Sequence, residues 1–390
     1  MIHEVSYVGK PVYELQQFAE GLALEGHEVY VLQFPEGLTR NERAQFAGAI
    51  QLEGRAYPSS RITLITPRLP GGGIFSRLLA AALAPSYLAK LFRDLRPDAI
   101  LCYAVPTYGW QAALGAKKNR IPFLFRAIDV SHLIRRGVFS PLVFFASRWV
   151  HRLASGISTH NKSLADSLTR DKKVTCSVSI DSPPVDIGDF AFDAQKRSSQ
   201  REIYQIDEEE KVILFLGSLF SFSGVLEAAS CFRKNSRKGE VFLIAGDGKL
   251  LRKIRRFTTE SNEPTNGRVV ALGRVKYSEL GELFSTADLA INTLEPKKVA
   301  HLALPNKVLQ YLANGLPVVS TPLKGLMSVD LVSKEVVFAE NPEQVMLRAI
   351  SEIRRESRTK SPRTNRLEQT FSARHSIKVL ESRLHALIEG

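Results

Sequence analysis

The segment Leu304-Pro305-Asn306-Lys307 has the composition of a phosphate-binding helix start. Proline is favoured in the first turn of a helix, which would leave the backbone amides of Asn306, Lys307 and Val308 pointing out of the helix end. That end carries partial positive charge, and the Lys307 ammonium adds a full one. Such a group stabilises the negative charge on a departing nucleoside diphosphate without a metal. The simpler alternative makes Lys307 a solvated helix residue and Pro305 an ordinary first-turn proline.

Apolar runs that end in glycine could complete this site. Residues 211–216, 240–245 and 268–272 have the pattern of buried strands. Ligands of open α/β sheets gather at the carboxyl ends of strands, where glycine lets the backbone approach a ligand closely. We therefore expect a ligand at the residues that follow these runs, with Arg274 as a second cation for a diphosphate; they are Gly217, Gly246, Asp247, Gly248, Gly273 and Arg274.

Strand and helix patterns alternate along both halves of the chain, which is typical of parallel sheets covered by helices. In the first half a helix begins at Pro11 and ends at Gly26. The expected strands are residues 2–7, 28–33, 61–66, 98–103, 121–126, 156–159 and 174–180 in the first half, and 211–216, 240–245, 268–272, 288–292 and 317–321 in the second.

The domain boundary is expected near residues 181–200, where Asp181-Ser-Pro-Pro184 breaks the pattern and a polar, basic stretch follows. This gives a first domain over residues 1–187 and a second over 188–365. Residues 356–366 form another polar connector. The helical pattern near the end predicts that residues 371–390 pack back onto the first domain.

Composition limits the function classes. The chain has 390 residues, 44% hydrophobic and 24% charged, which excludes a disordered or fibrous protein. Its net charge of +13 favours an anionic partner such as phosphorylated ligands or an anionic membrane surface, or else a well-hydrated surface alone. No nucleic-acid-binding motif is present, so nucleic acid is not expected. The three cysteines lie far apart, which predicts neither disulfides nor a metal site and favours a reducing, cytoplasmic setting.

Membrane contact is expected at the surface only. No apolar run reaches the length that crosses a bilayer, and the first ten residues lack the basic and apolar pattern of a signal peptide. Residues 74–93 and 135–152 mix large apolar side chains with Arg and Lys, as interfacial helices do. The alternative is that both segments cover the sheet. We expect this of most of 74–93, whereas 135–152, with Phe144, Phe145 and Trp149, is the better membrane candidate.

The stretch Leu304 to Thr321, LPNKVLQYLANGLPVVST, resembles the family 4 (group 1) retaining glycosyltransferases of the GT-B fold. Residues 212–219 (VILFLGSL), 242–254 (FLIAGDGKLLRKI) and 270–293 resemble further family segments in the same order. Residues 5–32 and 184–190 resemble its opening strand-helix-strand and its interdomain segment. The resemblance therefore covers nearly the whole chain.

This resemblance implies two Rossmann-like, doubly wound domains that face each other across a cleft. It implies sugar transfer from a nucleotide-sugar donor, without a cofactor or metal. The basic surface and the two apolar, basic segments lead us to expect a saccharide or lipid-linked acceptor of the cell envelope, with the enzyme peripheral on the inner face of the plasma membrane. Asp129, Lys307 and Arg274 would be catalytic, and Gly9, Arg126, Asp129 and His132 would contact the acceptor. Asp129 could instead cap a helix. The donor would contact Gly217, Gly246, Asp247, Gly248, Gly273, Arg274, Glu295, Leu304, Pro305, Asn306, Lys307 and Gln310.

The chain departs from the family at positions that carry charge. The family commonly has two glutamates where Leu302 and Gln310 stand here, and Glu295 lies nearby but out of register. It also tends to place Arg and Lys where this chain has Ser218 and Ser223-Gly224. These departures leave open a weakened or inactive glycosyltransferase-like binding or scaffold subunit. Two other enzymes are separate alternatives: a GT-B nucleotide-sugar epimerase, which would need additional acidic residues near the sugar, and a phosphorylase of the pyridoxal phosphate type, which would be a much longer chain.

Overall fold

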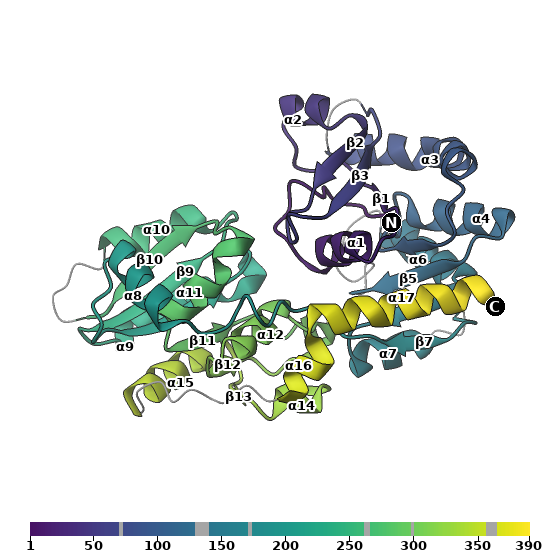
Figure 1. The fold of residues 1–390 in the computed structure, drawn as a ribbon. Coiled ribbons are helices and arrows are strands. Elements are labelled where there is room, and N and C mark those ends of the chain that lie inside the picture. The colour runs from purple at the N-terminus through teal and green to yellow at the C-terminus, as the bar shows by residue number, and fades with distance from the viewer. Residues whose placement is uncertain (70–72, 129–139, 171–173, 261–265, 298–299, 356–364) are drawn as a thin grey trace. The chain divides into compact units, whose positions relative to one another are not determined.

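The computed structural model describes residues 1–69, 73–128, 140–170, 174–260, 266–297, 300–355 and 365–390 (Figure 1). The chain divides into two compact units, and each is described by itself. The first comprises Met1–Pro184 and Ala373–Gly390, and the second comprises Val185–Ser372. The sequence pattern placed this boundary at residue 187 and the return to the first domain at residue 371.

The first unit is built on a sheet in two parts. One part has the order β1-β3-β2 and the other the order β4-β5-β6-β7. Ile2 joins them through single bridges to Leu32 of β1 and Cys102 of β4. All strand pairs are parallel except β2 with β3. The strands are β1 (Tyr30–Leu32), β2 (Gly48–Glu53), β3 (Arg61–Thr66), β4 (Ile100–Cys102), β5 (Phe123–Ala127), β6 (Gly156–Thr159) and β7 (Val178–Ile180).

Helices bury both faces of this sheet. Leu124 of β5 belongs to a core that includes Leu15 and Phe18 of α1 and Ile377 of α17. The next residue, Phe125, points to the other face, where its ring lies 5.6 Å from that of His151 on α6. This alternation is the period-two pattern of a strand buried on both sides. The helices are α1 (Glu14–Leu24), α2 (Arg40–Gln45), α3 (Gly73–Leu95), α4 (Gly109–Asn119), α6 (Ser140–Leu153), α7 (Lys162–Thr169) and α17 (Ala373–Glu389).

The second unit has one parallel sheet with the order β10-β9-β8-β11-β12-β13. The chain starts near the middle at β8, moves outward through β9 to β10, then returns to β11 and moves outward to β13 on the other side. Neighbouring strands β8 and β11 therefore form the topological switch point, where such sheets bind ligands. The strands are β8 (Lys211–Leu216), β9 (Glu240–Ala245), β10 (Arg268–Gly273), β11 (Leu289–Asn292), β12 (Val318–Ser320) and β13 (Val336–Phe338).

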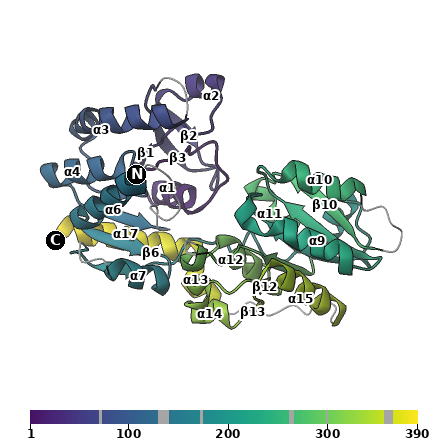
Figure 2. The same cartoon turned by 180° about the vertical axis from the view of Figure 1, so that it is seen from behind.

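Two apolar clusters sandwich this second sheet. Phe215 and Ile291 belong to the cluster that packs under α9 and α15, which lie side by side (Figure 2). Leu214 and Ala290 belong to the opposite cluster, under α11 and α12. The helices are α8 (Ala194–Ile203), α9 (Val225–Asn235), α10 (Leu251–Glu260), α11 (Leu280–Thr286), α12 (Asn306–Ala313), α13 (Lys324–Met327), α14 (Asp330–Ser333), α15 (Pro342–Arg355) and α16 (Asn365–Phe371), with short 3-10 turns η1 (Ser221–Ser223), η2 (Tyr277–Glu279) and η3 (Ala300–Leu302).

The prediction of two Rossmann-like domains is confirmed, but some elements differ. Residues 2–7 do not form a strand, because only Ile2 reaches both neighbours before the chain turns away. Strand β2 was not predicted, since its alternation of half-buried and exposed residues is that of a sheet edge. Strand β13 was not predicted either, because it is only three residues long.

Helix α3 corrects the expectation about apolar length. The helix has 23 residues and is apolar enough that it could cross a membrane, by length and composition alone. The helix buries one stripe in the first unit, at Ala80, Ala84, Leu88 and Phe92, and packs against α4. These residues lie four apart and so share one face of the helix. The prediction that most of residues 74–93 cover the sheet therefore applies to this face alone.

Candidate active site

The glycines after β8 and β9 are packed against each other at the carboxyl edge of the second sheet. The Gly217 amide donates to the Ala245 carbonyl at 3.0 Å, and the Gly246 amide donates to the Gly273 carbonyl at 2.7 Å. A Cβ atom on Gly246 would lie 1.8 Å from the Gly217 carbonyl oxygen, so no larger residue fits there. The three glycine-ended strands predicted from the sequence thus form one continuous rim.

Lys307 reaches across this rim from the helix that follows β11. Its Nζ lies 4.2 Å from the centre of the Phe215 ring on β8. A Cβ atom on Gly217 would lie 3.4 Å from the same nitrogen. The Lys307 ammonium makes no hydrogen bond or ion pair with another residue of the described part of the chain, and desolvation lowers its pKa to about 7. The structure therefore places a partly buried cation, without a carboxylate partner, at the switch point.

The start of α12 is fixed to the end of β8. The Leu216 amide donates to the hydroxyl of buried Tyr311, one turn along from Lys307, at 2.8 Å. Val308 and Leu309 are buried in the core beneath. These contacts hold the first turn of the helix, and with it Lys307, beside Gly217.

The first turn of α12 differs from the predicted one in two respects. Pro305 is the residue before the first turn, with φ −68° and ψ 115°, and not its first member. The Val308 amide donates to the Pro305 carbonyl at 2.9 Å, so it is not open to a ligand. The amides of Asn306 and Lys307 make no hydrogen bond within the described ranges. The predicted anion-binding end of α12 therefore has two open amides instead of three.

The other predicted donor contacts fall at the same sheet edge but differ in character. Arg274 follows β10, is exposed, and has no ion-pair partner among the residues described. Asp247 is exposed, and its carboxylate accepts the Gly248 amide at 2.7 Å. Leu304 is buried in the core. Gln310 is half-buried on α12.

Glu295 follows β11 at the switch point. Its side chain forms an ion pair with Lys297, and its amide donates to the Phe222 carbonyl at 3.1 Å. The carboxylate is therefore present at the correct edge of the sheet, although it occupies neither of the family's two glutamate positions. Its bond to Phe222 joins the loop after β11 to the loop after β8.

Sequence reasoning compared the loop over residues 218–224 with the family at Ser218 and Ser223-Gly224 but did not single out its two phenylalanines. The Thr293 hydroxyl donates to the Ser223 carbonyl at 2.7 Å, which holds this loop on the end of β11. The rings of Phe220 and Phe222 stack with centres 5.8 Å apart, and Phe222 is exposed. A flat exposed aromatic beside a phosphate site could stack on a nucleobase. The only sequence signal is the pair of phenylalanines in a loop that follows a strand.

Sequence reasoning did not assign His301 to the site either. It lies in η3, just before the segment that begins α12. Its Nδ1 atom is buried and has no hydrogen-bond partner in the part of the chain that the structure describes. A buried, unpaired ring nitrogen near Lys307 in the sequence can accept or donate a hydrogen bond to a ligand.

Arg126 in the first unit has a structural role in place of the expected contact with an acceptor. Its side chain is only 1% exposed, and its Nε and Nη2 atoms each donate to Glu14 at 3.0 Å. Its Nη1 atom donates to Ser158 and to the carbonyls of Thr159 and Asp181. Burial alone would raise the pKa of Glu14, but Arg126 holds it below its usual value. The pair joins α1 to β5, β6 and the end of β7.

The remaining predicted acceptor residues are less constrained by the structure. Asp129 and His132 lie outside the described residues. Gly9 is exposed, and its amide donates to the Ser6 hydroxyl at 2.9 Å. Its loop contains Glu4, whose carboxylate accepts the amides of Val105 and Thr107 at 2.7 and 2.6 Å. The opening loop is thus tied to the loop after β4, at the carboxyl edge of the first sheet.

Two family models match this chain. The model described as "Glycosyltransferase Family 4" matches residues 15–188, and "Glycosyl transferases group 1" matches residues 210–355. No curated protein sequence matches at a significant level.

Solved structures similar to this chain cover nearly its whole length. Anabaena Alr3699/HepE, in complex with UDP and glucose, has a TM-score of 0.72 at 15% identity, over 99% of both chains. Sucrose-phosphate synthase from Thermosynechococcus elongatus has a TM-score of 0.74 at 14% identity, over 100% of this chain and 99% of that one. WaaG, a glycosyltransferase involved in lipopolysaccharide biosynthesis, has a TM-score of 0.61 at 14% identity, over 100% and 98%. At these identities the similarity establishes the fold.

Proposed function

Because this chain belongs to the family 4, group 1 glycosyltransferases and has their GT-B fold, we propose that it is a retaining enzyme that takes its sugar from a nucleotide-sugar donor. The proposed acceptor is a saccharide or lipid-linked molecule of the cell envelope, reached from the cytoplasmic face of the membrane. Glycosyltransferase activity follows from family membership. The donor, the stereochemistry, the acceptor and the location are the proposal.

One observation carries the donor assignment: Lys307, a partly buried cation without an ion-pair partner among the described residues, beside Gly217 at the switch point. The phosphates of a nucleoside diphosphate would supply the negative charge that pairs with the Lys307 ammonium. The open amides of Asn306 and Lys307 would donate to the same phosphates. The UDP and UDP-glucose complexes of the similar Anabaena protein agree with a donor of this chemistry.

The same groups account for the chemistry of bond breaking. As the glycosidic bond lengthens, negative charge grows on the diphosphate oxygens, and a fixed cation and amides stabilise this state more than the intact donor. We propose that no bound metal is needed for this step. Arg274, exposed after β10, would supply a second positive charge to the departing diphosphate.

The proposed acceptor side rests on the surface of the first unit. Helix α6 exposes Phe145 and Trp149 to solvent, at 60% and 47% of their areas. The guanidinium of Arg152 lies 6.0 Å from the centre of the Trp149 ring, and that of Arg148 lies 5.4 Å from Phe144. Exposed aromatic rings with arginines beside them are typical of surfaces that bind anionic lipid. A lipid-linked acceptor would be presented at such a surface.

The test is donor turnover. Purified protein is incubated with a panel of UDP-, GDP- and other nucleotide sugars and a membrane extract that supplies acceptors, and nucleotide release is measured. We expect release with at least one donor, at equal rates with and without added Mg²⁺ or Mn²⁺. Strict dependence on a divalent ion would overturn the metal-independent mechanism, and release without any sugar transferred would overturn the acceptor class.

Asp129 provides a separate test of the acceptor side. Asp129→Ala is expected to lower sugar transfer while leaving nucleoside diphosphate binding unchanged, since the residue belongs to the unit that does not contain Lys307. Asp166→Ala removes a carboxylate of the same unit whose ion-pair partner among the described residues is Lys162, and it is a matched control. Full transfer by the Asp129 variant would remove this residue from the mechanism.

A further inference from the structure

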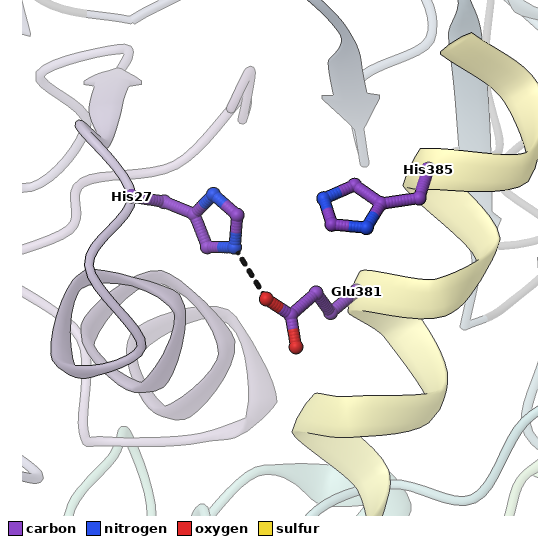
Figure 3. A group of neighbouring side chains, drawn as sticks. All are labelled: His27, Glu381 and His385. Atoms are coloured by element: carbon purple, nitrogen blue, oxygen red, sulfur yellow. Dashed lines mark hydrogen bonds and ion pairs between the residues drawn. The ribbon is translucent and has the colours of Figure 1, made fainter. Parts of the chain in front are cut away.

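A group of two histidines and a glutamate lies on the first unit, away from the carboxyl ends of its strands. His27 comes from the turn after α1, and Glu381 and His385 lie one turn apart on α17. Figure 3 shows His27 on one side and Glu381 and His385 facing it from the helix, with a contact between His27 and Glu381. One ligand atom of each side chain lies within 4.8 Å of the others.

The position of His27 is set by the end of α1. The Gly26 amide donates to the Ala23 carbonyl at 3.2 Å, and the His27 amide donates to the Leu22 carbonyl at 3.1 Å. These two bonds define a Schellman motif, with Gly26 at φ +95° as its left-handed residue. The motif turns the chain back over the helix end and directs His27 toward α17.

The position of α17 is set independently of the histidines. A Cβ atom on Gly21 would lie 2.2 Å from Ile377, so the absence of a side chain on α1 lets α17 approach closely. On the other side, Arg383 donates to buried Asp181 at 2.8 Å. Both sides of the group therefore stand on fixed backbone, which is what an ion-binding site requires.

The spacing of the three ligand atoms suits a small ion. Two ligands of a tetrahedral zinc ion lie about 3.4 Å apart, given bonds of about 2.0–2.1 Å. His27 Nε2 and Glu381 Oε1 are now 2.7 Å apart, and the whole group fits within 4.8 Å. Side-chain rotations that move the ligand atoms by about an ångström would place all three at bonding distance from one zinc ion. His27 and Glu381 are 38% and 24% exposed, so such rotation is open to them.

The group also opens onto a cavity. A pocket of about 450 Å³ is lined by all three side chains and by apolar residues that include Leu22, Leu91 and Phe92. It lies by Val29 and Ala99, just before β1 and β4 begin, and so at the sheet edge opposite to the one where Rossmann-like domains bind substrate. An ion held there would keep a coordination position open to the pocket.

We propose that His27, Glu381 and His385 form a binding site for a divalent transition-metal ion of the Zn²⁺ class. Two imidazole nitrogens and one carboxylate oxygen are a ligand set of zinc sites that keep an open position, whereas Mg²⁺ and Ca²⁺ prefer oxygen ligands. The ion would replace the contact between His27 and Glu381 and join the end of the chain to the turn after α1. His27 and Glu381 are 354 positions apart, so no local spacing in the sequence indicates the site.

The experiment is zinc titration of the full-length protein, freed of any affinity tag, by competition with a chromophoric chelator. We expect one high-affinity Zn²⁺ per chain, and Zn²⁺ binding unaffected by excess Mg²⁺. His385→Ala and Glu381→Ala should each weaken zinc binding by at least about tenfold, because loss of a residue that only hydrogen-bonds to a metal ligand already weakens binding by that factor. His375→Ala, an exposed histidine of the same helix, should bind zinc as the parent does.

Two further readouts keep the result decisive. Zinc should raise the melting temperature of the parent and of His375→Ala, and not that of His385→Ala, because binding to the folded state alone stabilises it. Co²⁺ should give visible bands without the sulfur charge-transfer band that the free thiol Cys176 would produce. Equal zinc affinity in the parent and in both ligand variants, or a sulfur band, would overturn the proposal.

Discussion

The ammonium nitrogen of Lys307 lies 4.2 Å from the centre of the Phe215 ring, so a residue that follows β11 is held over the end of β8. A cation over an aromatic face gains about 0.5–2 kcal/mol, which positions the group without neutralising it. No carboxylate of the described residues pairs with Lys307. The site is therefore preorganised for an anionic ligand, at a cost to the stability of the ligand-free protein.

The first prediction concerns binding. Lys307→Met, which keeps most of the length of the side chain and removes its charge, should weaken binding of the donor's nucleoside diphosphate about 10- to 100-fold, because a charge-assisted hydrogen bond contributes about 1.5–3 kcal/mol. Isothermal titration calorimetry measures this directly. Lys334→Met, at an exposed lysine just before β13 and thus at the opposite sheet edge, is the control. Equal dissociation constants for the parent and Lys307→Met would remove Lys307 from the site.

The second prediction concerns stability. Lys307→Met should raise the free energy of unfolding of the ligand-free protein by about 0.5–2 kcal/mol, because it removes a desolvated charge, and replacing destabilised functional residues often stabilises a protein. Folding lowers the pKa of Lys307 from 10.5 to about 7 by desolvation. Between pH 7 and 10 the unfolded state therefore holds this proton and the folded state does not, so the contribution of Lys307 to stability improves as pH rises through that window. Urea denaturation at pH 6.5 and 9 should show a smaller advantage of the variant at pH 9.

Binding should depend on pH in the opposite sense. A diphosphate favours charged Lys307, so the affinity for the donor's nucleoside diphosphate and kcat/KM should fall as pH rises above about 7. Near neutral pH, binding should also take up a fraction of a proton, which calorimetry in buffers of different ionisation enthalpy detects. Lys307→Arg, which stays charged, should lose this pH dependence. The same alkaline decline in the arginine variant would assign it to another group.

The third prediction separates a structural role of Arg126 from contact with an acceptor. Arg126→Met leaves Glu14 buried without its partner, which should cost about 3–5 kcal/mol of stability. The double variant with Glu14→Gln should recover part of this loss, because no buried charge is left unpaired. Denaturation of the four proteins of this cycle measures the coupling. A stable Arg126→Met protein with lost sugar transfer would restore Arg126 to the acceptor site.

The sequence predicted the parts of this molecule that local pattern determines. Strands 211–216, 240–245, 61–66 and 156–159 have the predicted bounds, because each is a short apolar run between turn residues. Lys307 and Gly217 could be assigned to one site because strand ends of a parallel sheet share an edge. The orientation of Arg126 could not be predicted, because its partner Glu14 is 112 positions away. An arginine near the end of a strand has the same sequence pattern whether it forms a buried ion pair or contacts an acceptor.

The final prediction concerns the membrane. Helix α6 buries Val143, Ala146 and Val150 and exposes aromatic residues on its other side, so substitution of the exposed set leaves the core unchanged. The triple variant Phe144→Ser, Phe145→Ser and Trp149→Ser should bind vesicles of anionic phosphatidylglycerol at least about tenfold more weakly, from the loss of apolar burial in the interface. Co-sedimentation measures it, and raising the salt from 0.1 to 0.5 M should weaken parental binding by screening the arginines.

Ile203→Ser is the control for loss of exposed apolar surface away from α6, because Ile203 is 67% exposed on α8 in the other unit. It should bind vesicles as the parent does. Residues 135–139 of the predicted membrane segment lie outside the described residues, so the test rests on α6 alone. Vesicle binding that is absent in the parent, or equal in the parent and the triple variant, would make α6 a soluble surface and leave a lipid-linked acceptor without its proposed docking face.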